Sequence, residues 1–69
     1  MKRILVNSEE LLSVGYDAEL QVLEVEFSDK NVYQLVNVSA DVYASLMNAP
    51  NQYEYFMAHI DAKFLGKKV

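Results

Sequence analysis

Two neighbouring stretches of alternating apolar residues, at 20–27 and 32–38, constrain the fold of this chain most. In the first stretch the apolar residues alternate with two glutamates, which is the period-two pattern of a strand with one buried face. The residues between the stretches, 28–31, read SDKN and are of turn-forming types. The sequence therefore predicts a β-hairpin.

The loop of this hairpin decides which face each side chain occupies. If the four residues SDKN join the strands symmetrically, Phe27 lies opposite Val32. Tyr33 and Leu35 then fall on the face opposite Phe27, whereas a slip of one residue reverses the assignment. Apolar side chains exposed on a sheet suggest a surface for a partner or ligand. The alternative is that the N-terminal segment folds over them.

Shorter apolar runs before the hairpin predict further strands. Residues 3–6 form one run, and residues 11–17 form another, with Leu12, Val14 and Tyr16 on one face. A glycine, Gly15, marks a bulge or a close approach within the second run.

Two helices are expected after the hairpin. Ser39 and Asn51 are of residue types that cap helix N-termini, and Asn51 has capping-box spacing to Glu54. Gly66 is of the type that stops a helix. Apolar stripes at helical spacing follow the caps: Val42, Tyr43, Leu46 and Met47, then Phe56, Met57, Ile60 and Phe64. The sequence thus predicts an α+β domain, a small antiparallel meander of three to four strands followed by two short helices.

The length and composition indicate a single domain over residues 1–69 that gains from a partner. A domain of this size buries only about 60% of its unfolded surface. The chain has no cysteine and one histidine, so disulfides and metal sites built on several Cys or His ligands are excluded. Because 52% of the residues are hydrophobic, we expect a homo-oligomer, although a well-filled core gives the same composition.

The net charge of −4 argues against a nucleic-acid partner, since phosphate contacts require a basic surface. The basic residues lie toward the two ends of the chain: Lys2, Arg3, Lys63, Lys67 and Lys68. No apolar run is long enough to span a bilayer, and the N-terminal run is too short for a signal peptide. We therefore expect a cytoplasmic protein without a membrane partner.

No catalytic set stands out, and neither an enzyme nor a cofactor or metal is expected. His59 has helical spacing to Tyr55 and Lys63, which suits a phosphate or base contact, but a solvated histidine gives the same pattern. A small hydrolase using His59 is the enzymatic alternative. The glutamates of the strand at 20–27 are more typical of a solvated face than of a cation site.

The segments VNSEELLSVGYD, LEVEF, VYQLVNVSADVYASLMNA and YFMAHIDAKF together resemble the KTSC domain. Ser8 and the segments VGYD (14–17), VY (32–33) and YF..HI (55–60) carry the resemblance best. The family motif is Tyr, any residue, Tyr; Tyr33 matches the first tyrosine and Leu35 replaces the second. The resemblance implies a small protein of bacteria or phages, for which RNA binding has been suggested from the lysyl-tRNA synthetase context.

These features together predict a non-catalytic, homo-oligomeric module that binds or sequesters a small anionic, nucleotide-like ligand, as a phage-type inhibitor of host signalling would. Five tyrosines are too many to bury in so small a body, and tyrosine suits pocket walls. The alternative is an RNA- or protein-binding module that uses the face of Tyr33 and Leu35. The candidate ligand-binding residues are Ser8, Tyr16, Tyr33, Leu35, Tyr55, His59, Lys63 and Lys67.

Overall fold

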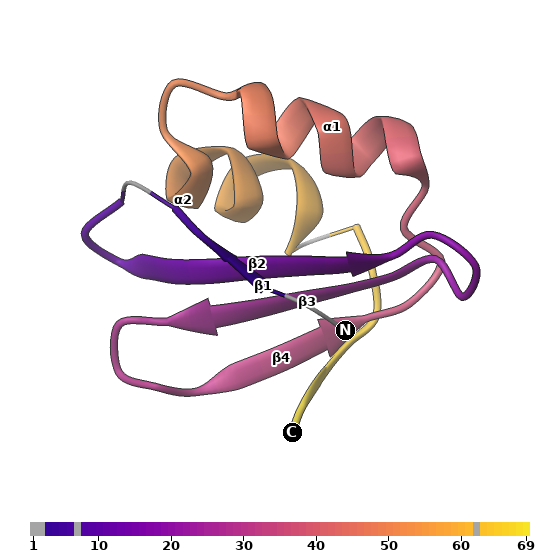
Figure 1. The fold of residues 1–69 in the computed structure, drawn as a ribbon, viewed down its shortest axis with the longest axis horizontal. Coiled ribbons are helices and arrows are strands. Elements are labelled where there is room, and N and C mark those ends of the chain that lie inside the picture. The colour runs from indigo at the N-terminus through magenta and orange to yellow at the C-terminus, as the bar shows by residue number, and fades with distance from the viewer. Residues whose placement is uncertain (1–2, 7, 62) are drawn as a thin grey trace.

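A computed structural model describes residues 3–6, 8–61 and 63–69. Five antiparallel strands form one sheet in the order β1-β2-β3-β4-β5, and the helices lie together over one of its faces (Figure 1). The elements are β1 (Arg3–Leu5), β2 (Leu11–Asp17), β3 (Val22–Phe27), β4 (Val32–Leu35), α1 (Ala40–Asn48), α2 (Gln52–Tyr55), η1 (Phe56–Ile60) and β5 (Gly66–Lys68). The α+β class and the two helices are as predicted, and the strand count exceeds the expected three to four.

The register of the β3–β4 hairpin differs by one residue from the symmetric four-residue loop. The Lys30 amide donates to the Phe27 carbonyl at 2.8 Å, and the Phe27 amide donates to the Asn31 carbonyl at 3.0 Å. Lys30 has a φ of 70°, so a turn is followed by a left-handed residue, as in three-residue hairpin loops. Phe27 therefore meets Asn31, and the predicted pairing of Phe27 with Val32 is wrong.

This register places Tyr33 and Leu35 on the face that the helices cover. Leu35 lies opposite Leu23, and Tyr33 lies opposite Val25. Leu35 is 2% exposed, and Tyr33 packs against the core. The expected exposed face of Tyr33 and Leu35 is therefore wrong, because a slip of one residue moves every side chain of a strand to the other face.

The chain after the second helix forms a fifth strand. Gly66 does not stop a helix; it begins β5 and lies opposite Leu35. The second helix has already ended in a π-helical turn, η1, closed by the Asp61 amide, which donates to the Phe56 carbonyl at 2.8 Å. Phe64 lies beyond that helix and still packs against the core.

A bulge in β2 sets which residues enter the core. The register shifts between Leu11 and Ser13 rather than at Gly15. Leu11 is consequently fully buried, where the simple alternation had placed Leu12 on the inner face with Val14. An extra residue in one strand reverses the alternation beyond it, and no glycine is needed for that.

The helices begin where the sequence indicates. Ser39 Oγ accepts from the Val42 amide at 3.3 Å, and Asn51 Oδ1 accepts from the Glu54 amide at 3.0 Å. Both apolar stripes supply side chains to a single core between the sheet and the helices. That core contains Leu11, Val14, Leu23, Val25, Leu35, Val38, Leu46, Phe56 and Ile60.

The helices of the described residues are all too short to cross a bilayer.

Candidate functional site

A cavity of about 560 Å³ lies between the inner face of the sheet and the second helix, near the turn that joins β3 and β4. This volume is within the range of about 300–1,000 Å³ that small-molecule sites occupy. Strand, turn and helix residues all contribute to its walls. The lining residues are Glu10, Phe27, Ser28, Asp29, Tyr33, Leu35, Tyr53, Phe56, Met57, Asp61 and Gly66. We call this cavity the aromatic pocket.

Four aromatic rings line the pocket, and the ring of Phe27 contacts the other three. The rings of Tyr33, Tyr53 and Phe56 lie 5.6, 6.2 and 5.7 Å from it, centroid to centroid. Their planes meet that of Phe27 at 76°, 88° and 71°, so each contact is edge to face. Three rings thus pack edge to face on Phe27, and we call this cluster of four rings the aromatic box.

The hairpin register builds this box. Tyr33 reaches Phe27 because the three-residue loop turns both side chains toward the helices. The Asn51 cap fixes the start of α2, the helix that carries Tyr53 into contact with Phe27. Phe56 is 2% exposed and forms the buried end of the pocket.

Three carboxylates line the same pocket, and they come from three separate parts of the chain. Glu10 precedes β2, Asp29 lies in the β3–β4 turn and Asp61 follows η1. Asp29 is held in place, since its Oδ1 and Oδ2 accept from the Asn31 amide at 3.0 Å and from Asn31 Nδ2 at 2.8 Å. A shallower depression beside it shares Glu10 and adds Glu54.

No lysine, arginine or histidine is among the described residues that line the pocket. Lys30 lies beside Asp29 in the turn, and Lys68 lies opposite Tyr33 in β5. Both are exposed and neither lines the cavity. The aromatic pocket is therefore negatively charged as well as apolar.

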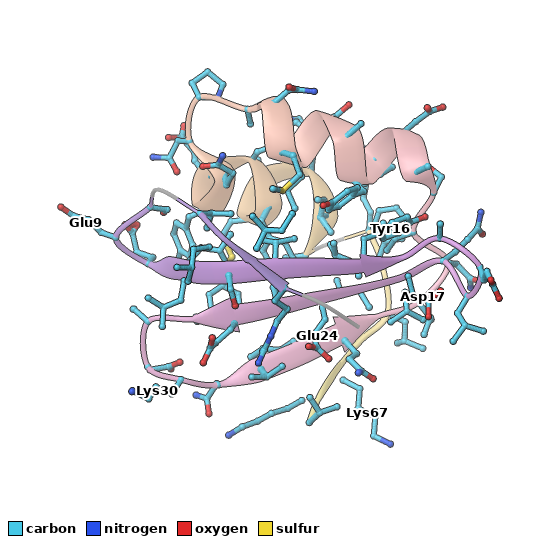
Figure 2. All side chains as sticks on the ribbon, in the orientation of Figure 1. Glu9, Tyr16, Asp17, Glu24, Lys30 and Lys67 are labelled. Atoms are coloured by element: carbon cyan, nitrogen blue, oxygen red, sulfur yellow. The ribbon has the colours of Figure 1, made fainter. Side chains whose placement is uncertain are left out.

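Of the predicted ligand-binding residues, Tyr33 and Leu35 line the aromatic pocket, and the others lie elsewhere. Tyr16 is on the helix side of the sheet at its other end, as Figure 2 shows, where its ring stacks on Tyr43 at 4.7 Å with planes 9° apart. Its hydroxyl donates to the Val38 carbonyl. These contacts give Tyr16 a structural role in packing against the core. Ser8 is half-buried and is not among the described residues that line the aromatic pocket or the depression beside it.

Tyr55 and His59 do lie together, as their helical spacing predicts. Their ring centroids are 4.6 Å apart, and both line a cavity of about 250 Å³ on the far side of the second helix. Lys63 does not join them, because the helix ends before it, and it is exposed outside that cavity. Among the described residues that line this cavity, Glu54 is acidic and none is a lysine or an arginine.

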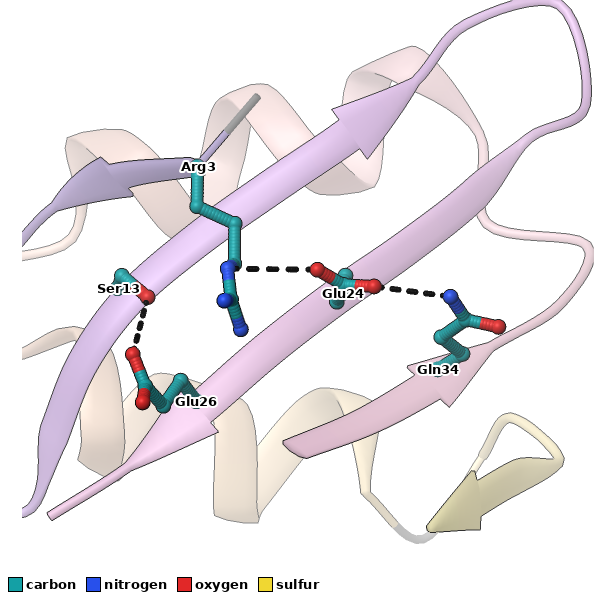
Figure 3. Close-up of polar contacts among 5 residues, drawn as sticks. All are labelled: Arg3, Ser13, Glu24, Glu26 and Gln34. Atoms are coloured by element: carbon teal, nitrogen blue, oxygen red, sulfur yellow. Dashed lines mark hydrogen bonds and ion pairs between the residues drawn. The ribbon is translucent and has the colours of Figure 1, made fainter. Parts of the chain in front are cut away.

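Lys67 lies on the outer face of the sheet, which the helices leave uncovered (Figure 2). Strand register places Arg3, Gly15, Glu24, Gln34 and Lys67 in one row across all five strands. Arg3 crosses over Gly15, which has no side chain, and its Nε lies 3.3 Å from Glu24 Oε1. Figure 3 shows this ion pair and the bond from Gln34 Nε2 to Glu24 Oε2, 2.8 Å long.

In the next row, Ser13 Oγ donates to Glu26 Oε1 at 3.1 Å (Figure 3). The outer face is thus a hydrogen-bonded polar surface. The described residues contain no group of three or more His, Cys, Asp or Glu side chains placed to hold a metal ion.

A model of the KTSC domain matches residues 7–64. The chain belongs to the KTSC family. A KTSC domain protein from Yersinia pestis, known from its crystal structure, is 32% identical and superposes with a TM-score of 0.95 over 99% of this chain and 96% of that chain. Over 56 residues, 41% are identical to an uncharacterized protein of Stutzerimonas stutzeri (strain A1501), covering 81% of this chain and 79% of that protein.

Sequence reasoning missed most of the KTSC domain's aromatic pocket. Phe27 and Phe56 were assigned to the core, and the acidic residues Glu10, Asp29 and Asp61 received no role. Nothing in their spacing brings these residues together, because they are separated by whole elements. The excess of tyrosine was the available signal. It singled out Tyr33, which lines the pocket, and also Tyr16, which stacks on Tyr43 away from it.

Proposed function

We propose that this KTSC domain is a non-catalytic binding module that holds a small ligand in the aromatic pocket. The observation that carries the proposal is the aromatic box, in which three rings pack on Phe27 at the side of a cavity of about 560 Å³. Aromatic walls with a few polar groups at the rim are the usual composition of a ligand site.

Several features support binding rather than catalysis as the role of this pocket. The lining residues include no serine–histidine pair, and the single histidine lies on the other side of the second helix. The carboxylates occupy the turn and the segments flanking β2 and η1, outside the buried aromatic floor. An arrangement of this kind can orient a ligand through its charge and its shape.

An anionic, nucleotide-like ligand held between copies of the chain is the second candidate. It is favoured by β5, which places Lys67 and Lys68 at the edge of the sheet, beside the strand that carries Tyr33. Among the described residues that line the three cavities reported above, none is a lysine or an arginine. Phosphate binding would therefore require the edge lysines of a second copy, as in the predicted homo-oligomer. A role in sequestering a host signal would follow from this candidate.

Ligand screening by two-dimensional ¹H–¹⁵N NMR tests the proposal. A panel of small cations, anions and neutral compounds is titrated into the labelled protein. We expect saturable shifts that cluster at Tyr33, Tyr53 and Met57. Shifts that cluster instead at the strand β5 lysines, with dimer formation, would favour the second candidate.

Two tyrosines on the same helix provide a matched pair of variants. Tyr53 lines the aromatic pocket, whereas Tyr55 lines the smaller cavity beside His59. We expect Tyr53→Ala to abolish the saturable shifts and Tyr55→Ala to keep them, with urea unfolding showing that both variants fold. Equal loss in both variants, or in neither, would contradict the pocket assignment.

A further inference from the structure

The charged residues that line the aromatic pocket indicate which sign of charge its ligand carries, which the shape of the pocket does not. Three carboxylates line the pocket, and no cationic side chain of the described residues does. A group of negative charge placed there would meet like charges, which disfavour binding. A group of positive charge would meet both carboxylates and ring faces.

The aromatic box adds a second attraction for a cation. The faces of aromatic rings carry the negative end of the ring quadrupole, and ammonium or guanidinium groups within about 6 Å of a ring centroid are attracted to them. Phe27, Tyr33, Tyr53 and Phe56 all line the pocket, so a cation bound there would lie close to aromatic rings. Sites walled by aromatic residues recognise quaternary ammonium groups.

We propose that the aromatic pocket binds a small organic cation, an alkylammonium compound with an apolar body. Its charged end would lie among Glu10, Asp29 and Asp61, and its body against Phe27, Tyr33 and Tyr53. This inference rests on the proposed function and assigns the chemical class of the ligand. It differs from the anionic ligand predicted from the sequence, because the terminal lysines behind that prediction do not line the pocket.

Three probe molecules of different charge test the inference by NMR titration of the whole chain. Choline is the cation, 3,3-dimethylbutanol is its uncharged carbon analogue, and adenosine monophosphate is the anion. We expect choline to shift the amide signals of pocket residues saturably. The uncharged analogue should bind about tenfold more weakly, since it lacks the cation–ring attraction.

A pair of variants with the same net charge isolates the pocket carboxylates. Glu10→Gln with Asp61→Asn removes two charges from the pocket, and Glu9→Gln with Glu19→Gln removes two exposed charges outside it. Choline affinity should fall about tenfold in the first variant, which loses two charge contacts, and stay unchanged in the second.

Each other outcome overturns a defined part of the account. Equal affinity for choline and its uncharged analogue, or equal weakening of choline binding in both double variants, would overturn the proposal that the ligand is a cation. The pocket would then bind ligands through apolar contacts alone. Saturation by adenosine monophosphate and not by choline would overturn the proposal that the ligand is a cation, and the proposed binding function would stand. Absence of saturable pocket shifts with these probes and with the wider panel would overturn both.

Discussion

Tyr33 lies directly opposite Val25 in the β3–β4 ladder. The pairing turns the Tyr33 ring toward the helices, where it meets Phe27 edge to face. The aromatic pocket depends on this register, because a slip of one residue would place Tyr33 on the outer face beside the glutamates.

A pair of introduced cysteines reports this register. Glu24 and Gln34 are directly opposite each other, and residues so paired have Cα atoms about 4.5–5.5 Å apart, within disulfide range. We expect Glu24→Cys with Gln34→Cys to form an intramolecular disulfide under mild oxidation, detected by mass spectrometry. Glu26→Cys with Gln34→Cys is the control and should stay reduced, because diagonal neighbours are too far apart. If the first pair stays reduced under conditions that keep the chain folded, the register is wrong.

Lys30 should be replaceable by glycine with a gain in stability. Its φ of 70° is unfavourable for a residue with a side chain and costs about 1–2 kcal/mol, which glycine would avoid. Glycine also loses more conformational freedom on folding, and this loss reduces the gain. We expect Lys30→Gly to raise the free energy of unfolding by about 0.5–1 kcal/mol in urea titrations. Ala18→Gly, at a residue without positive φ in another turn, should lower it. A loss of stability in Lys30→Gly would show that the turn has another form.

Removal of the Tyr16 hydroxyl should cost more than removal of the Tyr43 hydroxyl, although the two rings stack on each other. Tyr16 donates to the carbonyl of Val38, a residue that is fully buried, and Tyr16→Phe leaves that acceptor unsatisfied. We expect a loss of about 1–2 kcal/mol for Tyr16→Phe. No hydrogen bond of the Tyr43 hydroxyl is found among the described residues, so Tyr43→Phe should stay within about 0.5 kcal/mol. Thermal unfolding followed by circular dichroism compares them, and equal losses would refute the structural role of Tyr16.

The cap of the second helix, which carries Tyr53 of the aromatic pocket, should contribute to the free energy of unfolding. Asn51 accepts from the Glu54 amide, and Asn51→Ala is expected to cost about 1 kcal/mol. Asn48 bonds the Ala44 carbonyl at an exposed site, so Asn48→Ala should stay within about 0.5 kcal/mol. Urea unfolding measures both variants. A cost for Asn48→Ala as large as that for Asn51→Ala would show that the cap has no special part in starting α2.

The core and the helix starts were predictable because they depend on local pattern. The alternation at Leu23 and Val25 predicts which face of the strand is buried, and the stripe through Leu46 does the same for the helix. Neither prediction depends on the rest of the chain. The caps Ser39 and Asn51 were readable for the same reason, since capping depends on a residue and its next few neighbours.

The hairpin register was not predictable from the residues of its loop. SDKN has no glycine to mark the left-handed position, and that position is occupied by Lys30, which carries no turn signal. β5 was missed for a related reason, because Gly66 follows an apolar stripe and so has the pattern of a helix stop. Its role as a strand depends on the edge of β4 being open to pair with it.

The aromatic pocket could not be predicted because it depends on both the hairpin register and strand β5. Tyr33 was singled out as a binding residue but placed on the wrong face, and Gly66 lines the pocket only because β5 exists. The three acidic residues come to the lining of one pocket through the fold alone. Their role could not be read from a sequence in which acidic residues are spread through the chain.

Intermolecular nuclear Overhauser effects from the methyl protons of choline test the central claim most directly. We expect contacts to the ring protons of Tyr33, Tyr53 and Phe27, which line the aromatic pocket, and none to Tyr55 or His59 across the helix. Contacts to Tyr55 and His59 alone, or none to the pocket rings in a sample saturated with choline, would contradict it.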